Sequence, residues 1–253
     1  MRRVVRQPLP KRAVSYMARK SQEVQQKLLA GTLVIKKLWK SARDTDSMGD
    51  VSQTLQRMMG TYERCMYCLD SHGCDIEHFR PKAPFPDHAF VWENLLLCCT
   101  ECGRLKGNRF PLDGNGQPLM IDPCQQDPWL YLDFDPDTGN ITARFDPATN
   151  CPSPQGEATV DLLHLDQREA LSAVYLRGFD RLGKLLQEHL EAAAPIDSTQ
   201  LIQQLIEEDD HGLLGWCFRE PSAYTAPPFD RLHQDHPAVW SACRQALQQQ
   251  HLI

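Results

Sequence analysis

The spacing of apolar residues predicts that the N-terminal part of the chain is helical. Over residues 13–43, apolar side chains recur at helical intervals, and few helix breakers occur apart from Gly31. A polar stretch at 44–47 ends this pattern, and a second helix is predicted over 51–59 with Asp50 or Ser52 as its N-cap. The residues that carry the first pattern are Leu28, Leu29, Leu33, Val34, Leu38 and Trp39.

Beyond residue 111 the pattern predicts one β-hairpin followed by helices. Two short runs rich in apolar and aromatic residues, 129–134 and 141–145, flank a turn-forming segment of Asp, Pro, Gly and Asn. After Gly156 leucines return at helical spacing. Helices are predicted over 161–191, 198–210 and 237–252, with an irregular segment at 220–228.

Four cysteines between these regions have the spacing of two zinc knuckles. The pairs are Cys65 with Cys68, and Cys99 with Cys102, and 30 residues separate them. Two residues between paired cysteines let both sulfurs face one point, so two such pairs can close one tetrahedral Zn²⁺ site. Four thiolates leave no open coordination position, so this zinc would be structural. The alternative is four unrelated buried cysteines.

The segment between the cysteine pairs carries a candidate catalytic pair, Glu77 and His78. It reads as a strand that ends at Arg80, because a residue before proline favours extended backbone. A carboxylate can hold a divalent cation, and an imidazole can take a proton from water near neutral pH. A Glu-His pair taken alone is equally typical of an exposed strand end.

The motifs over residues 65–111 together resemble the HNH nucleases, which have a small ββα-metal or treble-clef fold. Segments 75–82 and 106–111 most resemble the HNH subunit of Septu-type anti-phage systems, which also occurs with retrons. The resemblance implies a metal-dependent endonuclease that hydrolyses DNA. It also implies an ATPase partner with an ABC- or SMC-like head and, in retron systems, a complex with the reverse transcriptase.

The resemblance also assigns roles to individual residues. His78 matches the general base, Glu77 matches a ligand of Mg²⁺ or Mn²⁺, and Asn94 matches the asparagine that braces the loop and orients the base. Gly103 stands where the family carries a histidine or asparagine ligand, and glycine has no side chain to coordinate. Asn108, one to two turns later, could supply the missing oxygen.

Basic residues around this segment are candidates for contact with nucleic acid. Positive side chains bind the phosphate backbone. Their alternative role is solvated charge, balanced by nearby acidic residues. The candidates are Arg80, Lys82, Lys106 and Arg109.

The charge of the chain is strongly polarised. The net charge is −6, yet residues 1–43 contain 12 Lys and Arg and one acid, whereas the remainder holds 15 basic and 32 acidic residues. A basic N-terminal region suggests contact with nucleic acid or an acidic partner. Packing of this region on the acidic half of its own chain is an equal alternative. The sequence has neither a run of about 18 apolar residues nor a secretory signal, so we expect a cytoplasmic protein without membrane contact.

These observations predict an α+β protein built around a small zinc-clamped ββα-metal core. Two other functions compete with the partnered nuclease: a zinc-ribbon module that binds nucleic acid or protein without cutting, and a stand-alone HNH restriction-type nuclease. The predicted segments are a basic helical region at 1–60, the nuclease core at 61–111, a loop and hairpin at 112–155, and a helical region at 156–253.

Overall fold

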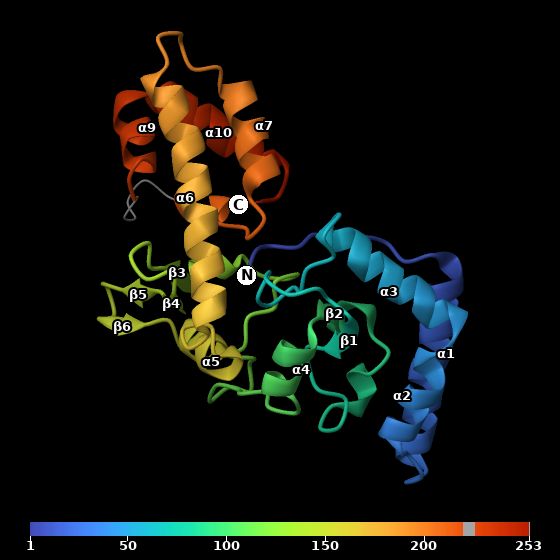
Figure 1. Ribbon diagram of the computed structural model, residues 1–253. Helices are drawn as coiled ribbons and strands as arrows, with labels where there is room; N and C mark the ends of the chain where they lie inside the picture. Colours follow the sequence, from blue (N-terminus) through green and yellow to red (C-terminus); the bar gives the residue numbers. More distant parts are fainter. Residues whose placement is uncertain (220–225, 253) are drawn as a thin grey trace. The chain divides into compact units, whose positions relative to one another are not determined.

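The computed structural model describes residues 1–219 and 226–252, which form two compact units (Figure 1). One unit is Val5–Cys124, and the other joins Met1–Val4 to Gln125–Ile253. Most of the irregular segment predicted at 220–228 lies outside the described residues. The class is mixed α+β, as predicted, with many helices and small sheets.

Three helices open the unit Val5–Cys124. Helix α1 packs against α3 and against η1, and α3 packs against β2. The helical pattern predicted over 13–43 divides in two because Gly31, at a φ of +67°, turns the chain after α1. The bounds are α1 (Lys11–Leu29), α2 (Ile35–Arg43) and α3 (Asp46–Met59).

Two short strands and a helix follow within the same unit. β1 and β2 pair antiparallel, with Asp75 opposite Cys98 and His78 opposite Leu95. Every residue of β2 is buried, so this strand is the apolar centre of the segment. The bounds are β1 (Asp75–His78), the 3-10 turns η1 (Pro86–His88) and η2 (Trp92–Asn94), β2 (Leu95–Cys98) and α4 (Thr100–Lys106).

The other unit contains the predicted hairpin and a group of helices. Leu132 pairs with Ala143 and Phe134 with Ile141, which confirms the hairpin. Helix α7 packs against α6 and α10, and α9 packs against both of these helices as well. The bounds are η3 (Pro128–Leu130), β3 (Leu132–Phe134), β4 (Ile141–Ala143), β5 (Phe145–Asp146), β6 (Cys151–Pro152), α5 (Pro154–Leu163), α6 (Glu169–Glu191), α7 (Ser198–Glu208), α8 (Leu214–Cys217), α9 (Phe229–Asp235) and α10 (Pro237–Gln249).

Some predicted helix boundaries were wrong. Helix α3 begins at Asp46 rather than at 51, because the buried Met48 gives its first turn an apolar anchor. The helix predicted over 161–191 is two helices, α5 and α6, since His164 adopts a left-handed conformation that ends α5. The pairing of β5 with β6 and the short helices α8 and α9 were not predicted.

Among the helices of the described residues, none has the length and apolar character needed to cross a membrane.

Candidate functional site

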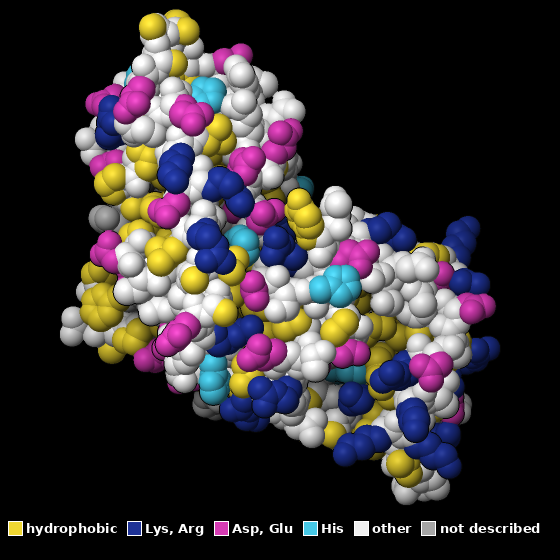
Figure 2. Space-filling view, in the orientation of Figure 1, with side chains coloured by type: hydrophobic (Ala, Val, Ile, Leu, Met, Phe, Trp, Pro, Cys, Tyr) yellow, Lys and Arg dark blue, Asp and Glu magenta, His cyan; other side chains and the backbone are white. Residues whose placement is uncertain are grey.

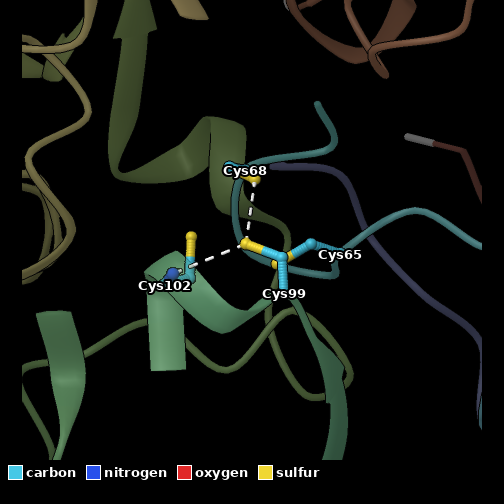
Figure 3. Close-up of side chains that lie close together, drawn as sticks. All are labelled: Cys65, Cys68, Cys99 and Cys102. Atoms are coloured by element: carbon cyan, nitrogen blue, oxygen red, sulfur yellow. Dashed lines mark hydrogen bonds between the residues drawn. The ribbon is translucent and has the colours of Figure 1, made fainter. Parts of the chain in front are cut away.

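The four predicted zinc ligands come together in the folded chain. Their sulfur atoms all lie within 4.8 Å of one another, and all four residues are buried (Figure 3). The Sγ atoms of Cys68 and Cys99 are 3.9 Å apart. A tetrahedral zinc with bonds of about 2.3 Å would place its sulfurs about 3.8 Å apart, so this cluster can hold a metal ion such as zinc.

The second cysteine pair sits at the start of α4. Cys99 is the N-cap of α4, and its Sγ accepts a hydrogen bond from the backbone N–H of Cys102 at 3.4 Å. Hydrogen bonds from Cys102, Cys65 and Cys68 hold the pKa of the Cys99 thiol far below its usual range. Thiolates are the form that binds metal. The pKa of Cys102 is raised instead, by its hydrogen bonds to the other three cysteines and by burial, so a metal ion would have to displace a proton there.

His78 is enclosed at the end of β1. Only 2% of its surface is exposed, and its Nε2 lies 3.0 Å from the carbonyl oxygen of Ala89. Burial, together with the positive charge of Lys82, lowers the pKa of His78 to about 3, so the ring is neutral near pH 7. A carbonyl can only accept, so Nε2 carries the proton and Nδ1 carries the lone pair that a general base needs.

Asn94 ties together the two loops beside His78. Its side-chain oxygen accepts from the backbone N–H of Arg80 at 2.7 Å. Its amide nitrogen donates to the carbonyls of Arg80 at 3.1 Å and of His88 at 3.0 Å. Because Ala89 follows His88, these bonds hold the loop whose carbonyl accepts from the imidazole. Asn94 therefore links the backbone of Arg80 to the loop that carries Ala89, and its bracing of the general base stays a prediction.

Glu77 is bonded to a buried lysine. The Nζ atom of Lys106 donates to Glu77 Oε1 and to the carbonyl of His78, both at 2.7 Å, and the Lys106 side chain is fully buried. Burial raises the pKa of Glu77, and the Lys106 ammonium opposes this. The prediction that Lys106 contacts phosphates needs correction, because its ammonium faces Glu77 inside the unit and not the surface.

The groups predicted to bind a catalytic divalent ion do not form a complete site. Glu77 Oε1 is already bonded to Lys106, and Asn108 is exposed two residues past the end of α4. A Cβ built on Gly103 would lie 3.8 Å from Glu77 Oε2, so position 103 faces Glu77 but has no ligand atom. Among the His, Cys, Asp and Glu side chains that the structure describes, only the cysteine cluster gathers three or more around a point.

The other predicted basic contacts differ in exposure. Arg109 is exposed, whereas Arg80 is half-buried, with its guanidinium 5.4 Å from the ring centroid of Phe110. Lys82 is half-buried, with Nζ 5.7 Å from the ring centroid of Trp39. Arg80, Lys82 and Arg109 therefore keep part or all of the side chain at the surface.

One residue of the site was missed in the sequence, and another was assigned the wrong partner. The ring of Trp39, from α2, meets His78 edge-on with centroids 4.3 Å apart. No local pattern could have linked α2 to β1. A signal did exist for Lys106, because it lies three residues after Gly103 on α4 and so shares the face that looks toward Glu77.

Comparison with known proteins gives two partial matches. A 145-residue match to the Septu protein PtuA of Bacillus mycoides (strain KBAB4) is 30% identical and covers 45% of this chain and 19% of that protein. A 113-residue match to the Septu protein PtuB of Bacillus thuringiensis is 31% identical and covers 43% of this chain and 38% of that protein. The chain thus spans less than half the length of either curated relative.

No family model matches the chain, and no solved structure matches it. The candidate site therefore rests on its own geometry, and the two partial matches relate the chain to the Septu proteins.

Proposed function

We propose that this chain is an HNH-type endonuclease that hydrolyses phosphodiester bonds, with DNA as substrate, and serves as the effector of a Septu-type anti-phage complex. The observation that carries the hydrolase part is the fixed tautomer of His78, whose Nε2 donates to the carbonyl of Ala89 and leaves the lone pair on Nδ1. The partial matches to two Septu proteins support the defence part.

His78 would act as the general base. Its Nδ1 takes the proton of a water molecule as the water oxygen attacks phosphorus and the 3′ oxygen leaves. Burial keeps the free imidazole neutral, and a phosphate anion bound nearby would raise its pKa because opposite charge favours the protonated ring. General-base catalysis of this kind contributes roughly 10² to 10⁴ in rate.

The negative phosphodiester also needs positive charge close by. Lys82, half-buried near His78, can meet the phosphate from the surface side. The resemblance to HNH nucleases implies Mg²⁺ or Mn²⁺ as a further cation. Lys106 already occupies Glu77 Oε1, the carboxylate oxygen nearest to it.

We also propose that the cysteine cluster binds zinc in a structural role. Four thiolates would fill the tetrahedron and leave no position for water or substrate. Such a zinc would connect the loop after α3 to the start of α4, and so hold β1 and β2 between them.

Plasmid nicking tests the catalytic assignment. Wild type and His78→Ala are compared in Mg²⁺, in Mn²⁺ and in EDTA, with His72→Ala as a control because His72 is exposed. We expect His78→Ala to cut at least about 10²-fold more slowly and His72→Ala to match wild type. Equal cutting by wild type and His78→Ala would remove His78 from the mechanism.

A non-catalytic zinc module is the second candidate. The absence of a side chain at Gly103 and the pairing of Glu77 with Lys106 favour it. Zinc binding and DNA binding without nicking under any of these conditions would support the module over the nuclease.

The partner is tested separately from the chemistry. We propose an ATPase with an ABC- or SMC-like head, and a retron reverse transcriptase where the system includes one. Co-expression with the product of the adjacent gene, followed by affinity purification and size-exclusion chromatography, should give one complex. Elution of this chain alone, with nicking retained, would favour the stand-alone nuclease.

A further inference from the structure

Helix α2 carries a row of basic side chains on one face. Lys36, Lys40 and Arg43 are spaced by four and three residues, so they share a face of the helix. All three are exposed, and α2 contains no acidic residue. Figure 2 shows Lys and Arg side chains gathering where Figure 1 draws α1 and α2. We call Lys36, Lys40 and Arg43 the α2 basic face.

The neighbouring face of α2 places this row beside the candidate catalytic residue. Trp39 is buried, and its ring meets the His78 ring at a centroid distance of 4.3 Å. Lys36 lies three residues before Trp39 and Arg43 lies four residues after it, so both are neighbours of Trp39 on the helix surface. The α2 basic face therefore lies along the flank of α2 that leads to His78.

Lys82 continues the row toward the site. Its Nζ lies 5.7 Å from the ring centroid of Trp39. Burial lowers the pKa of Lys82, and repulsion from Lys106, Lys36 and Arg43 adds to this, while the Glu77 carboxylate opposes it. Lys36 and Arg43 thus lie near enough to Lys82 for their charges to act on it. A group of like charges around a half-buried lysine is stabilised when a polyanion binds to it.

The acidic neighbour of Arg43 does little to offset the charge of the α2 basic face. Arg43 Nε lies 3.3 Å from Asp44 Oδ1, but the side chains are 59% and 75% exposed. Ion pairs as exposed as this contribute little in water, so Arg43 can exchange Asp44 for a phosphate at small cost.

We propose that the α2 basic face and Lys82 form a track for the phosphodiester backbone of a nucleic acid, leading to His78. The proposal rests on the proposed function and adds a binding surface outside the segment between the cysteine pairs. From Lys36 to Arg43 the helix rises about 10 Å, which matches about three phosphates along one strand of a duplex. A charge row that ends at a candidate nuclease site favours nucleic acid over an acidic protein as its occupant.

Salt-dependent binding tests the track. A short fluorescein-labelled DNA duplex and an RNA strand of matching sequence are titrated with the chain at several salt concentrations, in a His78→Ala background that prevents cutting. Removing the α2 basic face should make the plot of log affinity against log salt shallower by up to about 2.7 for the duplex, at about 0.9 for each phosphate that is no longer neutralised. The test variant carries Lys36→Ala, Lys40→Ala and Arg43→Ala.

A matched control removes the same number of exposed positive charges from the other unit. It should leave the salt slope unchanged. That result would exclude a general loss of positive charge as the cause of the change in the test variant. The control variant carries Arg177→Ala, Lys184→Ala and Arg231→Ala, all at the surface of that unit.

A second pair of variants guards against a folding defect. Lys40→Glu should weaken binding more than Lys184→Glu, and both should keep the urea midpoint of wild type, since both side chains lie at the surface. Equal slopes for the test and control variants, or no binding of either nucleic acid by the parent chain, would overturn the track.

Failure of the track and failure of the nuclease assignment give different results. Equal nicking by wild type and His78→Ala would refute the nuclease, yet the salt slopes would still decide the track. Nicking that needs His78, together with unchanged slopes in the α2 variant, would refute the track alone. A track that acts on RNA and not on DNA would appear as a slope change in the RNA titration only.

Discussion

Replacing Lys106 with methionine tests whether its ammonium holds the candidate catalytic carboxylate in place. Lys106 Nζ makes two hydrogen bonds of 2.7 Å, to Glu77 Oε1 and to the carbonyl of His78, from a side chain with no exposed surface. Hydrogen bonds that involve a charged group contribute about 1.5–3 kcal/mol each, so the pair corresponds to about 3–6 kcal/mol. Methionine keeps most of the apolar stem but leaves both acceptors without this donor.

Two features of Glu77 reduce this loss. Its side chain is 19% exposed, and burial has already raised its pKa, so the carboxylate can reach water or take up a proton. We therefore expect Lys106→Met to lower the free energy of unfolding by about 3 kcal/mol, at the lower end of the range for breaking a buried ion pair.

Urea denaturation of the zinc-loaded protein measures this change. The midpoint should fall while the slope with denaturant stays the same. Lys40→Met is the control and should stay within about 0.5 kcal/mol of wild type, because Lys40 is exposed. The double variant Lys106→Met with Glu77→Gln should cost less than the sum of the single variants, since neither charge is then left unpaired. A Lys106→Met effect below about 1 kcal/mol, or strict additivity, would refute the reasoning.

Three further predictions concern the cysteine cluster, the buried imidazole and one turn. Cys102→Ser should lose bound zinc in elemental analysis and several kcal/mol of stability, whereas Cys74→Ser, at an exposed cysteine outside the cluster, should keep both. The pKa of His78 is lowered from 6.5 to about 3. Between these two pH values the unfolded chain therefore binds a proton at this imidazole and the folded chain does not. The contribution of the neutral His78 to the free energy of unfolding is fully present above pH 6.5 and should fall toward pH 3 by up to about 1.4 kcal/mol per pH unit. Urea unfolding of wild type and His78→Gln at each pH measures this difference. Gly139 and Gly116 have φ of +78° and +76°, but a Cβ would lie 2.2 Å from a carbonyl oxygen of α6 at Gly139 and would meet nothing within 4 Å at Gly116. In thermal unfolding, Gly139→Ala should therefore cost about 1–3 kcal/mol more than Gly116→Ala, and equal losses would contradict the steric argument.

Local patterns in the sequence determined several elements of this protein. The two-residue spacing within each cysteine pair was enough to predict the four-sulfur cluster, because a short loop directs both sulfurs to one point. The turn residues between 134 and 141 predicted the hairpin for a similar reason, since they specify the backbone over a few residues. Asp197, which accepts from Thr199 and Gln200, marks the start of α7 where the pattern predicted a helix from 198.

Only the tertiary structure decided what surrounds the candidate catalytic residues. The contact of Trp39 with His78 joins α2 to β1, and the bond of Lys106 to Glu77 joins α4 to β1. The sequence suggested Lys106 as a phosphate contact because positive side chains bind phosphates, whereas the structure buries it beside a partner of opposite charge. Such pairs are 29 or more residues apart along the chain. They form because packing of the whole unit brings the elements together, and no spacing within one element encodes them.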